Sequence, residues 1–61
     1  MAKFVIFRGT DFKYYWHLKA PNGEIICQSE GYNSKQGAVN GVDACKRYAS
    51  YASVEDLARV A

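Results

Sequence analysis

Residues 13–32, "KYYWHLKAPNGEIICQSEGY", decide the fold of this chain. The first part alternates between two faces, with Phe12, Tyr14, Trp16, Leu18 and Ala20 on one and Lys13, Tyr15, His17 and Lys19 on the other. A period of two is typical of a half-buried strand, so the pattern predicts a strand over residues 12–20. Aromatic residues next to Lys and His are also typical of surfaces that stack nucleic-acid bases, and the two interpretations must be separated.

A tight hairpin is predicted next, at "APNGE". Pro21 presets φ at the first corner, and Gly23 accepts the positive φ that returns the chain to a strand over residues 24–29. A three-residue loop would place Ala20 opposite Glu24. Carried along the strand, this register puts Ile26 beside Leu18, Gln28 beside Trp16, and Cys27 beside His17.

Two further elements flank this hairpin. "KFVIFR", Lys3 to Arg8, is rich in residues that favour strands, and it ends at a Gly-Thr-Asp turn. Ser34 is a suitable cap for a helix from Lys35 to Ala49. The apolar stripe of this helix consists of Ala38, Val42, Cys45 and Ala49, at spacings of four, three and four.

Packing of the helix on the sheet is predicted to centre on Gly41. A glycine inside a helix costs about 1 kcal/mol relative to Ala, and close approach of the helix to the sheet would offset this. Trp16 is the bulky neighbour that we expect above it. The predicted core consists of Trp16, Leu18, Ile26, Gly41 and Val42.

The chain length suggests that a partner subunit is needed. A 61-residue chain forms one domain, residues 1–61, and buries only about 60% of its unfolded surface. Small domains usually add disulfides, a metal or a second subunit. Cys27 and Cys45 form no metal-binding pair, there is one His, and no secretory signal or membrane span is evident. We therefore expect a cytoplasmic protein with reduced thiols that forms oligomers.

Charge and motifs favour a protein without catalytic activity. The net charge is only +2, and the basic residues are scattered rather than clustered, unlike a dedicated nucleic-acid surface. His17 beside Cys27 would be a candidate nucleophile pair, but no carboxylate that could orient it is evident. No phosphate-binding loop or metal-ligand pattern is present. We expect no enzyme activity, no catalytic residues, no cofactor and no metal.

The chain resembles the YegP-like family, small bacterial proteins of unknown function. The resemblance rests on "YYWHLKAPNGEIICQSEGYNSK" followed by "VNGVDACKR" and covers about residues 4–50. His17 stands where the family often has Arg, and "RGTDF" lacks the usual glycine just before the second strand. The family carries no established catalytic or binding residues, so the resemblance assigns none here.

The resemblance implies an α+β fold, a β-β-β-α-β unit with an antiparallel sheet and one helix on one face. Two such units share one sheet and exchange their C-terminal strands, which implies a homodimer. By local pattern, residues 51–61 slightly favour a short helix. The family pattern instead makes "SVEDLA", residues 53–58, the exchanged strand, and we adopt that prediction.

Function is then expected on the sheet face opposite the helix. With the predicted phase, this face carries Val5, Phe7, Lys13, Tyr15, His17, Lys19, Ile25 and Cys27. The candidate partner-binding residues are Val5, Phe7, Tyr15, His17, Lys19 and Ile25. A semi-apolar patch with few charges suits a protein partner, so we predict a non-enzymatic homodimeric binding or assembly module. The alternative is weak nucleic-acid binding through Tyr15 and His17.

Overall fold

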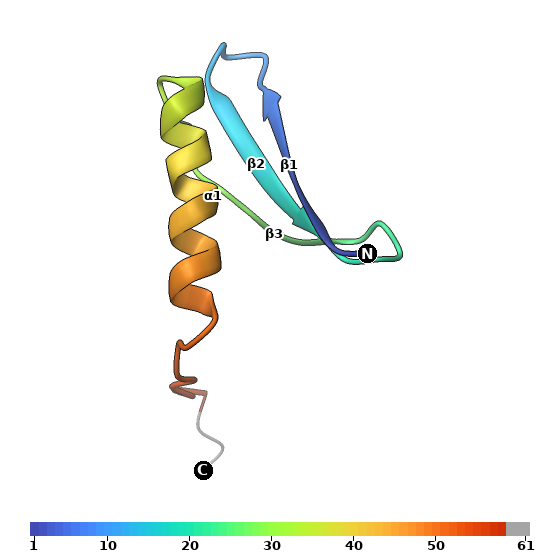
Figure 1. Cartoon of the computed structure of the whole chain (residues 1–61), viewed down its shortest axis with the longest axis vertical. Coiled ribbons are helices and arrows are strands. Elements are labelled where there is room, and N and C mark those ends of the chain that lie inside the picture. The colour runs from blue at the N-terminus through green and yellow to red at the C-terminus, as the bar shows by residue number, and fades with distance from the viewer. Residues whose placement is uncertain (59–61) are drawn as a thin grey trace.

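The computed structural model describes residues 1–58, so the end of the predicted domain, residues 59–61, lies outside the described residues. It contains three strands and one helix, in the predicted order (Figure 1). The elements are β1 (Lys3–Arg8), β2 (Tyr14–Lys19), β3 (Ile25–Gln28) and α1 (Lys35–Ala49). The predicted α+β fold is confirmed.

The three strands form an antiparallel sheet in the order β1-β2-β3. Ile6 lies opposite Trp16 on the side of the helix, and Phe7 lies opposite Tyr15 on the other side. Because partners in a ladder share a face, β1 and β2 present the two sets of side chains that the alternation predicted.

The β2–β3 hairpin has the predicted turn but not the predicted register. Gly23 has a φ of 91°, and the Ala20 N–H donates to the Glu24 carbonyl over 2.8 Å, as the three-residue loop requires. A β-bulge then shifts the pairing, so that Leu18 faces Cys27 while Lys19 faces Ile25. Ile26 is the extra residue in the bulge, and a one-residue shift exchanges the two faces beyond it.

Three predicted positions in β3 are therefore wrong. Cys27 pairs with Leu18, on the helix side of the sheet, and not with His17. Gln28 pairs with His17, on the opposite face, and not with Trp16. Ile26 pairs with no residue of β2 and is 60% exposed, so it does not belong to the core of the single chain.

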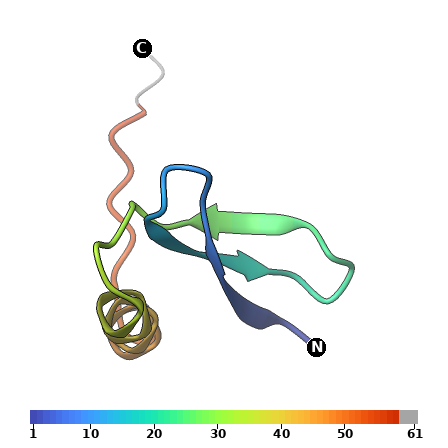
Figure 2. The ribbon, with the colours of Figure 1, turned by 90° about the horizontal axis from the view of Figure 1, so that it is seen from above.

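Helix α1 begins where the capping residue predicts. The Ser34 side-chain oxygen accepts a hydrogen bond from the Gly37 N–H at 3.0 Å, and Lys46 and Arg47 lie in the last turn, where cations favour the helix dipole. The helix lies against β2 and β1, and within the described residues its backbone does not come close to that of β3 (Figure 2). The helix therefore covers only part of its side of the sheet.

The core lies between α1 and β2. Among the described residues, the buried apolar side chains are Trp16, 7% exposed, and Ala38, which is fully buried. The Phe4 and Trp16 rings meet edge to face at 5.4 Å. Leu18 and Val42 are half-buried. This core is small even for a chain of this length.

Gly41 is the point of closest approach, but Trp16 is not its nearest neighbour. A Cβ atom at Gly41 would overlap the hydroxyl oxygen of Tyr32 and would lie 2.6 Å from Tyr32 Cζ and 3.0 Å from Trp16 Nε1. The predicted contact with Trp16 is therefore present, and sequence reasoning missed Tyr32. The indole N–H of Trp16 is buried without a hydrogen-bond acceptor in the described residues.

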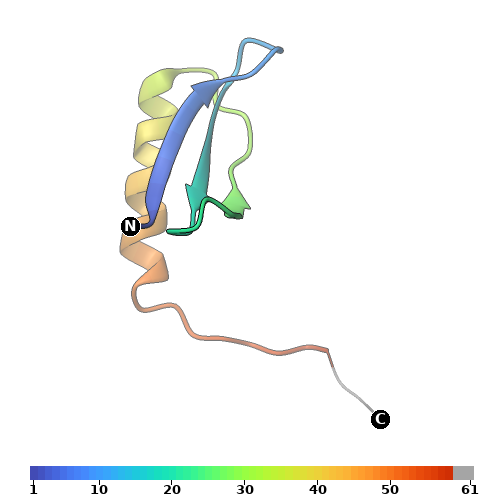
Figure 3. The same cartoon turned by 90° about the vertical axis from the view of Figure 1, so that its right-hand side faces the viewer.

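The segment after α1 leaves the body of the domain. Residues 52–58 are neither helix nor strand, and every residue from 50 to 58 is exposed (Figures 1 and 3). Val54 is 94% exposed and Leu57 is 79% exposed. The short helix favoured by the local pattern does not form in the described residues. The exchanged strand stays a prediction, since the exchange requires a second copy of the chain.

Candidate functional site: a groove on the open face of the sheet

The sheet face opposite the helix is uncovered, and we call it the open face. The ladder pairs place on it Lys3, Val5, Phe7, Tyr15, His17, Lys19, Ile25 and Gln28. All six candidate partner-binding residues from the sequence therefore share this face. Gln28 replaces Cys27 there because of the β-bulge.

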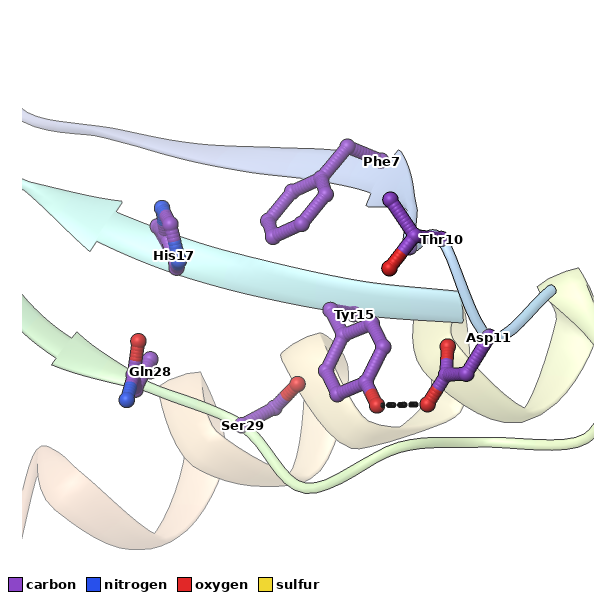
Figure 4. Close-up of a pocket in the computed structure, with 8 residues that line it drawn as sticks. Phe7, Thr10, Asp11, Tyr15, His17, Gln28 and Ser29 are labelled. Atoms are coloured by element: carbon purple, nitrogen blue, oxygen red, sulfur yellow. Dashed lines mark hydrogen bonds between the residues drawn. The ribbon is translucent and has the colours of Figure 1, made fainter. Parts of the chain in front are cut away.

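One end of the open face is hollowed into a groove with a volume of about 340 Å³ (Figure 4). Its lining comes from the end of β1, the loop that follows, β2 and the end of β3. The lining residues are Phe7, Gly9, Thr10, Asp11, Tyr15, His17, Gln28 and Ser29. The groove thus contains three of the six candidate residues, Phe7, Tyr15 and His17, and excludes the other three.

The Tyr15 side chain is held in a fixed position in the groove. Its hydroxyl donates a 2.5 Å hydrogen bond to Asp11 Oδ2 (Figure 4). Two glycines make room for the ring, because a Cβ at Gly9 would lie 2.7 Å from Tyr15 Cε1, and one at Gly31 would lie 3.0 Å from the hydroxyl oxygen. The ring position is therefore fixed by the backbone around it as well as by the carboxylate.

Asp11 is itself fixed by the loop between β1 and β2. Its Oδ1 accepts a 3.0 Å hydrogen bond from the Lys13 N–H, two residues ahead, which is the pattern of an Asx turn. The Gly9 N–H donates to the Lys13 carbonyl at 2.8 Å and closes the loop. Between them, Phe12 has a φ of 66°, in the left-handed region that favours glycine.

Three aromatic rings form the floor of the groove. The Phe7 and Tyr15 rings are nearly parallel, with centroids 5.8 Å apart and an interplanar angle of 19°. The His17 ring meets Phe7 at 4.6 Å and 62°. Phe7 is 37% exposed, so an occupant of the groove would contact its ring directly.

The hydrogen bond between Tyr15 and Asp11 shifts the pKa of both groups. Donation by the Tyr15 hydroxyl, helped by the Lys13 N–H, lowers the pKa of Asp11 below its usual value of 3.8. The same bond raises the pKa of Tyr15 above 10.0, because ionising the phenol would lose it. At neutral pH the groove therefore contains a carboxylate and an uncharged tyrosine.

The polar groups in the groove support binding better than reaction. Cys27 lies on the other side of the sheet from His17, so the two cannot act as a nucleophile and base. The Ser29 hydroxyl accepts a hydrogen bond from the backbone N–H of Trp16 at 2.9 Å and donates one to the Glu30 carbonyl at 2.8 Å, so it is already engaged. No group of three or more His, Cys, Asp or Glu residues that could hold a metal occurs among residues 1–58.

Sequence reasoning missed five of the eight groove residues, Asp11 and Gln28 among them, and one residue of the core. Asp11 carries a readable signal, because an Asp in a short loop often accepts a hydrogen bond from the backbone N–H two residues ahead, as Asp11 does from Lys13. Gln28 was hidden by the bulge, which no glycine marks. Tyr32 bridges to Tyr14 and reaches Gly41, contacts that depend on the path of residues 29–33.

These features define a class of small α+β domain, in which one helix partly covers a three-stranded antiparallel sheet whose other face is open and grooved. Within the described residues, no helix has the length and apolar character needed to cross a bilayer. The family model described as "Domain of unknown function (DUF1508)" matches residues 10–56. The chain belongs to this family, which includes the YegP-like proteins, and the predicted resemblance is confirmed.

Similar proteins cover nearly the whole chain. A UPF0339 protein of Neisseria meningitidis is 41% identical over 54 residues, which are 88% of this chain and 96% of the relative. A UPF0339 protein of Methanosarcina acetivorans is 37% identical over 88% of this chain and 93% of the relative. Their names state no activity.

Two solution NMR structures share the fold. A protein from Haloferax volcanii has a TM-score of 0.83 and 41% identity, over 90% of this chain and 93% of that one. The protein ATU0232 from Agrobacterium tumefaciens has a TM-score of 0.78 and 37% identity, over 93% of this chain and 92% of that one.

Proposed function

We propose that this chain is a non-enzymatic homodimeric binding module, in which two copies exchange their C-terminal segments and each presents its open face to a protein partner. The observation that carries the dimer is the exposed apolar segment after α1. Tyr51, Val54 and Leu57 are 70%, 94% and 79% exposed. Large apolar side chains grouped in this way mark an interaction site.

The sheet offers a place for this segment. β1 and β3 are both edge strands, with unpaired backbone groups along one side. Beside β3 the sheet is also bare, because α1 does not reach it and Ile26 is 60% exposed. An extended segment from a second copy would pair its backbone with an edge and cover this apolar surface.

The total surface area supports the same conclusion. The chain exposes 5166 Å², whereas a compact monomer of this mass exposes about 4,000 Å². The excess of about 1,200 Å² is comparable to what one partner buries in a stable dimer. The radius of gyration is 13.9 Å, against about 10.5 Å for a compact domain of this length.

The open face supports binding of a protein partner. It carries a preformed groove with a floor of aromatic rings, and aromatic side chains are enriched in protein interfaces. Weak nucleic-acid binding through Tyr15 and His17 is the second candidate. It is disfavoured by Asp11, whose carboxylate lies in the same groove and would repel phosphate.

Sedimentation equilibrium at micromolar concentration tests the dimer. We expect a mass twice the 6.8 kDa of one chain. Leu57→Asp should shift the population toward monomer, because burying a charge in an apolar interface is costly. Glu55→Gln, in the same segment, is the matched control and should stay dimeric. A native chain that sediments as a folded monomer would refute the proposal.

A further inference from the structure

We infer that the groove on the open face binds an arginine side chain of the partner protein. This inference rests on the proposed function, because it names the chemistry that the open face recognises. It is carried by the juxtaposition of the Asp11 carboxylate with the Phe7 and Tyr15 rings in one preformed groove.

Asp11 supplies the charge complementarity. Its two oxygens accept one hydrogen bond each, from the Tyr15 hydroxyl and the Lys13 N–H. A carboxylate has about four lone-pair sites, so about two stay free for a ligand. Asp11 forms no salt bridge with any described residue, in contrast to Asp43, which pairs with Arg47 at 3.5 Å on α1. The Lys13 charge also acts on Asp11, but no described residue forms a salt bridge with it, so the groove presents a carboxylate at a fixed position with room for a second cation.

The rings select the kind of cation. A guanidinium is planar, weakly hydrated and able to stack on aromatic faces while it donates to a carboxylate. Elsewhere in this molecule a guanidinium already lies over aromatic rings, since Arg8 is 5.1 Å from the centroid of Phe12 and 5.6 Å from that of Tyr14. An ammonium is a compact, strongly hydrated charge that cannot stack. The groove should thus favour Arg over Lys.

The remaining lining is compatible with this ligand. Gln28 and Thr10 make no side-chain hydrogen bonds to described residues, so the Gln28 amide oxygen and the Thr10 hydroxyl are free to accept from further N–H groups. The His17 ring lies at the end of the aromatic floor opposite Asp11 (Figure 4). The groove volume of about 340 Å³ accommodates one long side chain.

An NMR titration tests the inference. The ¹⁵N-labelled protein is titrated with three capped tripeptides, acetyl-Val-X-Val-amide, in which X is Arg, Lys or citrulline. Citrulline keeps the planar shape of Arg without its charge. The Arg peptide should shift the amide signals of groove residues and bind about fivefold more tightly than the citrulline peptide, which loses both one exposed cation–π contact and one exposed ion pair. It should also bind more tightly than the Lys peptide, which keeps the ion pair but cannot stack.

Variants identify the groups responsible. Asp11→Asn should reduce the affinity for the Arg peptide about two- to threefold, because it removes the ion pair and leaves the contact with the rings. The amide oxygen of the introduced side chain can still accept the hydrogen bond from the Tyr15 hydroxyl. Asp43→Asn, at an exposed carboxylate on α1, is the matched control and should leave the affinity unchanged. Phe7→Leu should remove the preference for Arg over Lys and retain the groove.

The outcomes separate this inference from the proposed function. Equal affinities for the three peptides at the groove would overturn the arginine preference, yet leave a protein-binding open face. Guanosine monophosphate binding the groove more tightly than the Arg peptide would overturn both, since it would assign the face to nucleic acid. The dimer is measured separately by sedimentation, so its failure would not be confused with either result.

Discussion

The two ends of the sheet differ in how far one chain can complete them. Over β1 and β2, α1 covers the sheet, Trp16 and Ala38 are buried, and Gly41 lets the helix approach. Over β3, the backbone of α1 does not come close to the strand, and the Ile26 side chain stays exposed. The first region, over β1 and β2, is a small core that one chain builds alone, and we call it the self-sufficient region. The second region, over β3, is incomplete in a single chain, and we call it the incomplete region. The same molecule carries the exposed apolar segment that follows α1.

The largest expected effect would break the self-sufficient region. Gly41→Ala places a methyl group against Tyr32 and Trp16, and overpacking of this kind costs about 1–3 kcal/mol. The higher helix propensity of Ala offsets about 1 kcal/mol, so the overpacking cost is the difference between this variant and a Gly→Ala control elsewhere in the helix. Thermal unfolding followed by circular dichroism measures it. Gly37→Ala is the matched control in the same helix, because a Cβ there would come no closer than 3.2 Å to its neighbours. Equal melting temperatures for both variants would show that the helix is not closely packed at Gly41.

The incomplete region is tested by two adjacent residues of the same type. Ile26 and Ile25 are 60% and 52% exposed in one chain, so a monomer would lose little from either change. If a second copy covers β3, Ile26→Thr should lower the free energy of unfolding by about 1–2 kcal/mol, a large part of the value of burying an isoleucine. Ile25→Thr, on the open face, should cost less. Urea denaturation at several protein concentrations measures both, and indistinguishable midpoints would argue against coverage at the bulge.

A smaller effect is expected in the loop that shapes the groove. Phe12 has a φ of 66°, which costs a non-glycine residue about 1–2 kcal/mol. Phe12→Gly should therefore stabilise the chain by up to about 1 kcal/mol, after the loss of the exposed Arg8 contact at 5.1 Å. Phe12→Ala removes the ring and keeps the backbone strain, so it should not stabilise. A lower melting temperature for the glycine variant would mean that the ring matters more than the backbone.

The smallest effect is on the pH dependence of the groove. The pKa of Asp11 is lowered, so its contribution to stability is present above pH 3.8 and is lost as the pH falls through its lower folded pKa. The pKa of Tyr15 is raised, so its contribution is complete below pH 10.0 and is lost as the pH rises through its higher folded pKa. NMR titration of the Asp11 carboxyl and Tyr15 ring carbons should give both directions. Asp11→Asn should return the pKa of Tyr15 toward 10.0, and an unchanged value would remove the hydrogen bond as the cause.

Much of the self-sufficient region could be predicted from the sequence. β1 and α1 have the predicted bounds, because a compact strand-forming run and a capping Ser34 are local signals. The hairpin turn followed from Pro21 and Gly23. Trp16 was placed in the core by alternation alone. In these cases the physical cause acts within a few residues of the chain.

The rest depends on contacts that no local pattern contains. Ile25, Ile26 and Cys27 are three consecutive apolar residues, so an extra residue in the bulge changes the faces without changing the pattern. Asp11 joins the groove because Tyr15 folds over Gly9 and Gly31, which are far from each other in the sequence. The structure of residues 53–58 cannot follow from one chain if its partner strand belongs to a second copy.

The most direct test of the dimer is an NMR sample that mixes fully labelled and unlabelled copies. Filtered experiments then detect only nuclear Overhauser effects between different copies. We expect such effects between residues 53–58 of one copy and an edge strand of the other, with Leu57 in contact with apolar side chains of the sheet. A sample that shows no effects between copies and tumbles as a single 6.8 kDa chain would contradict it.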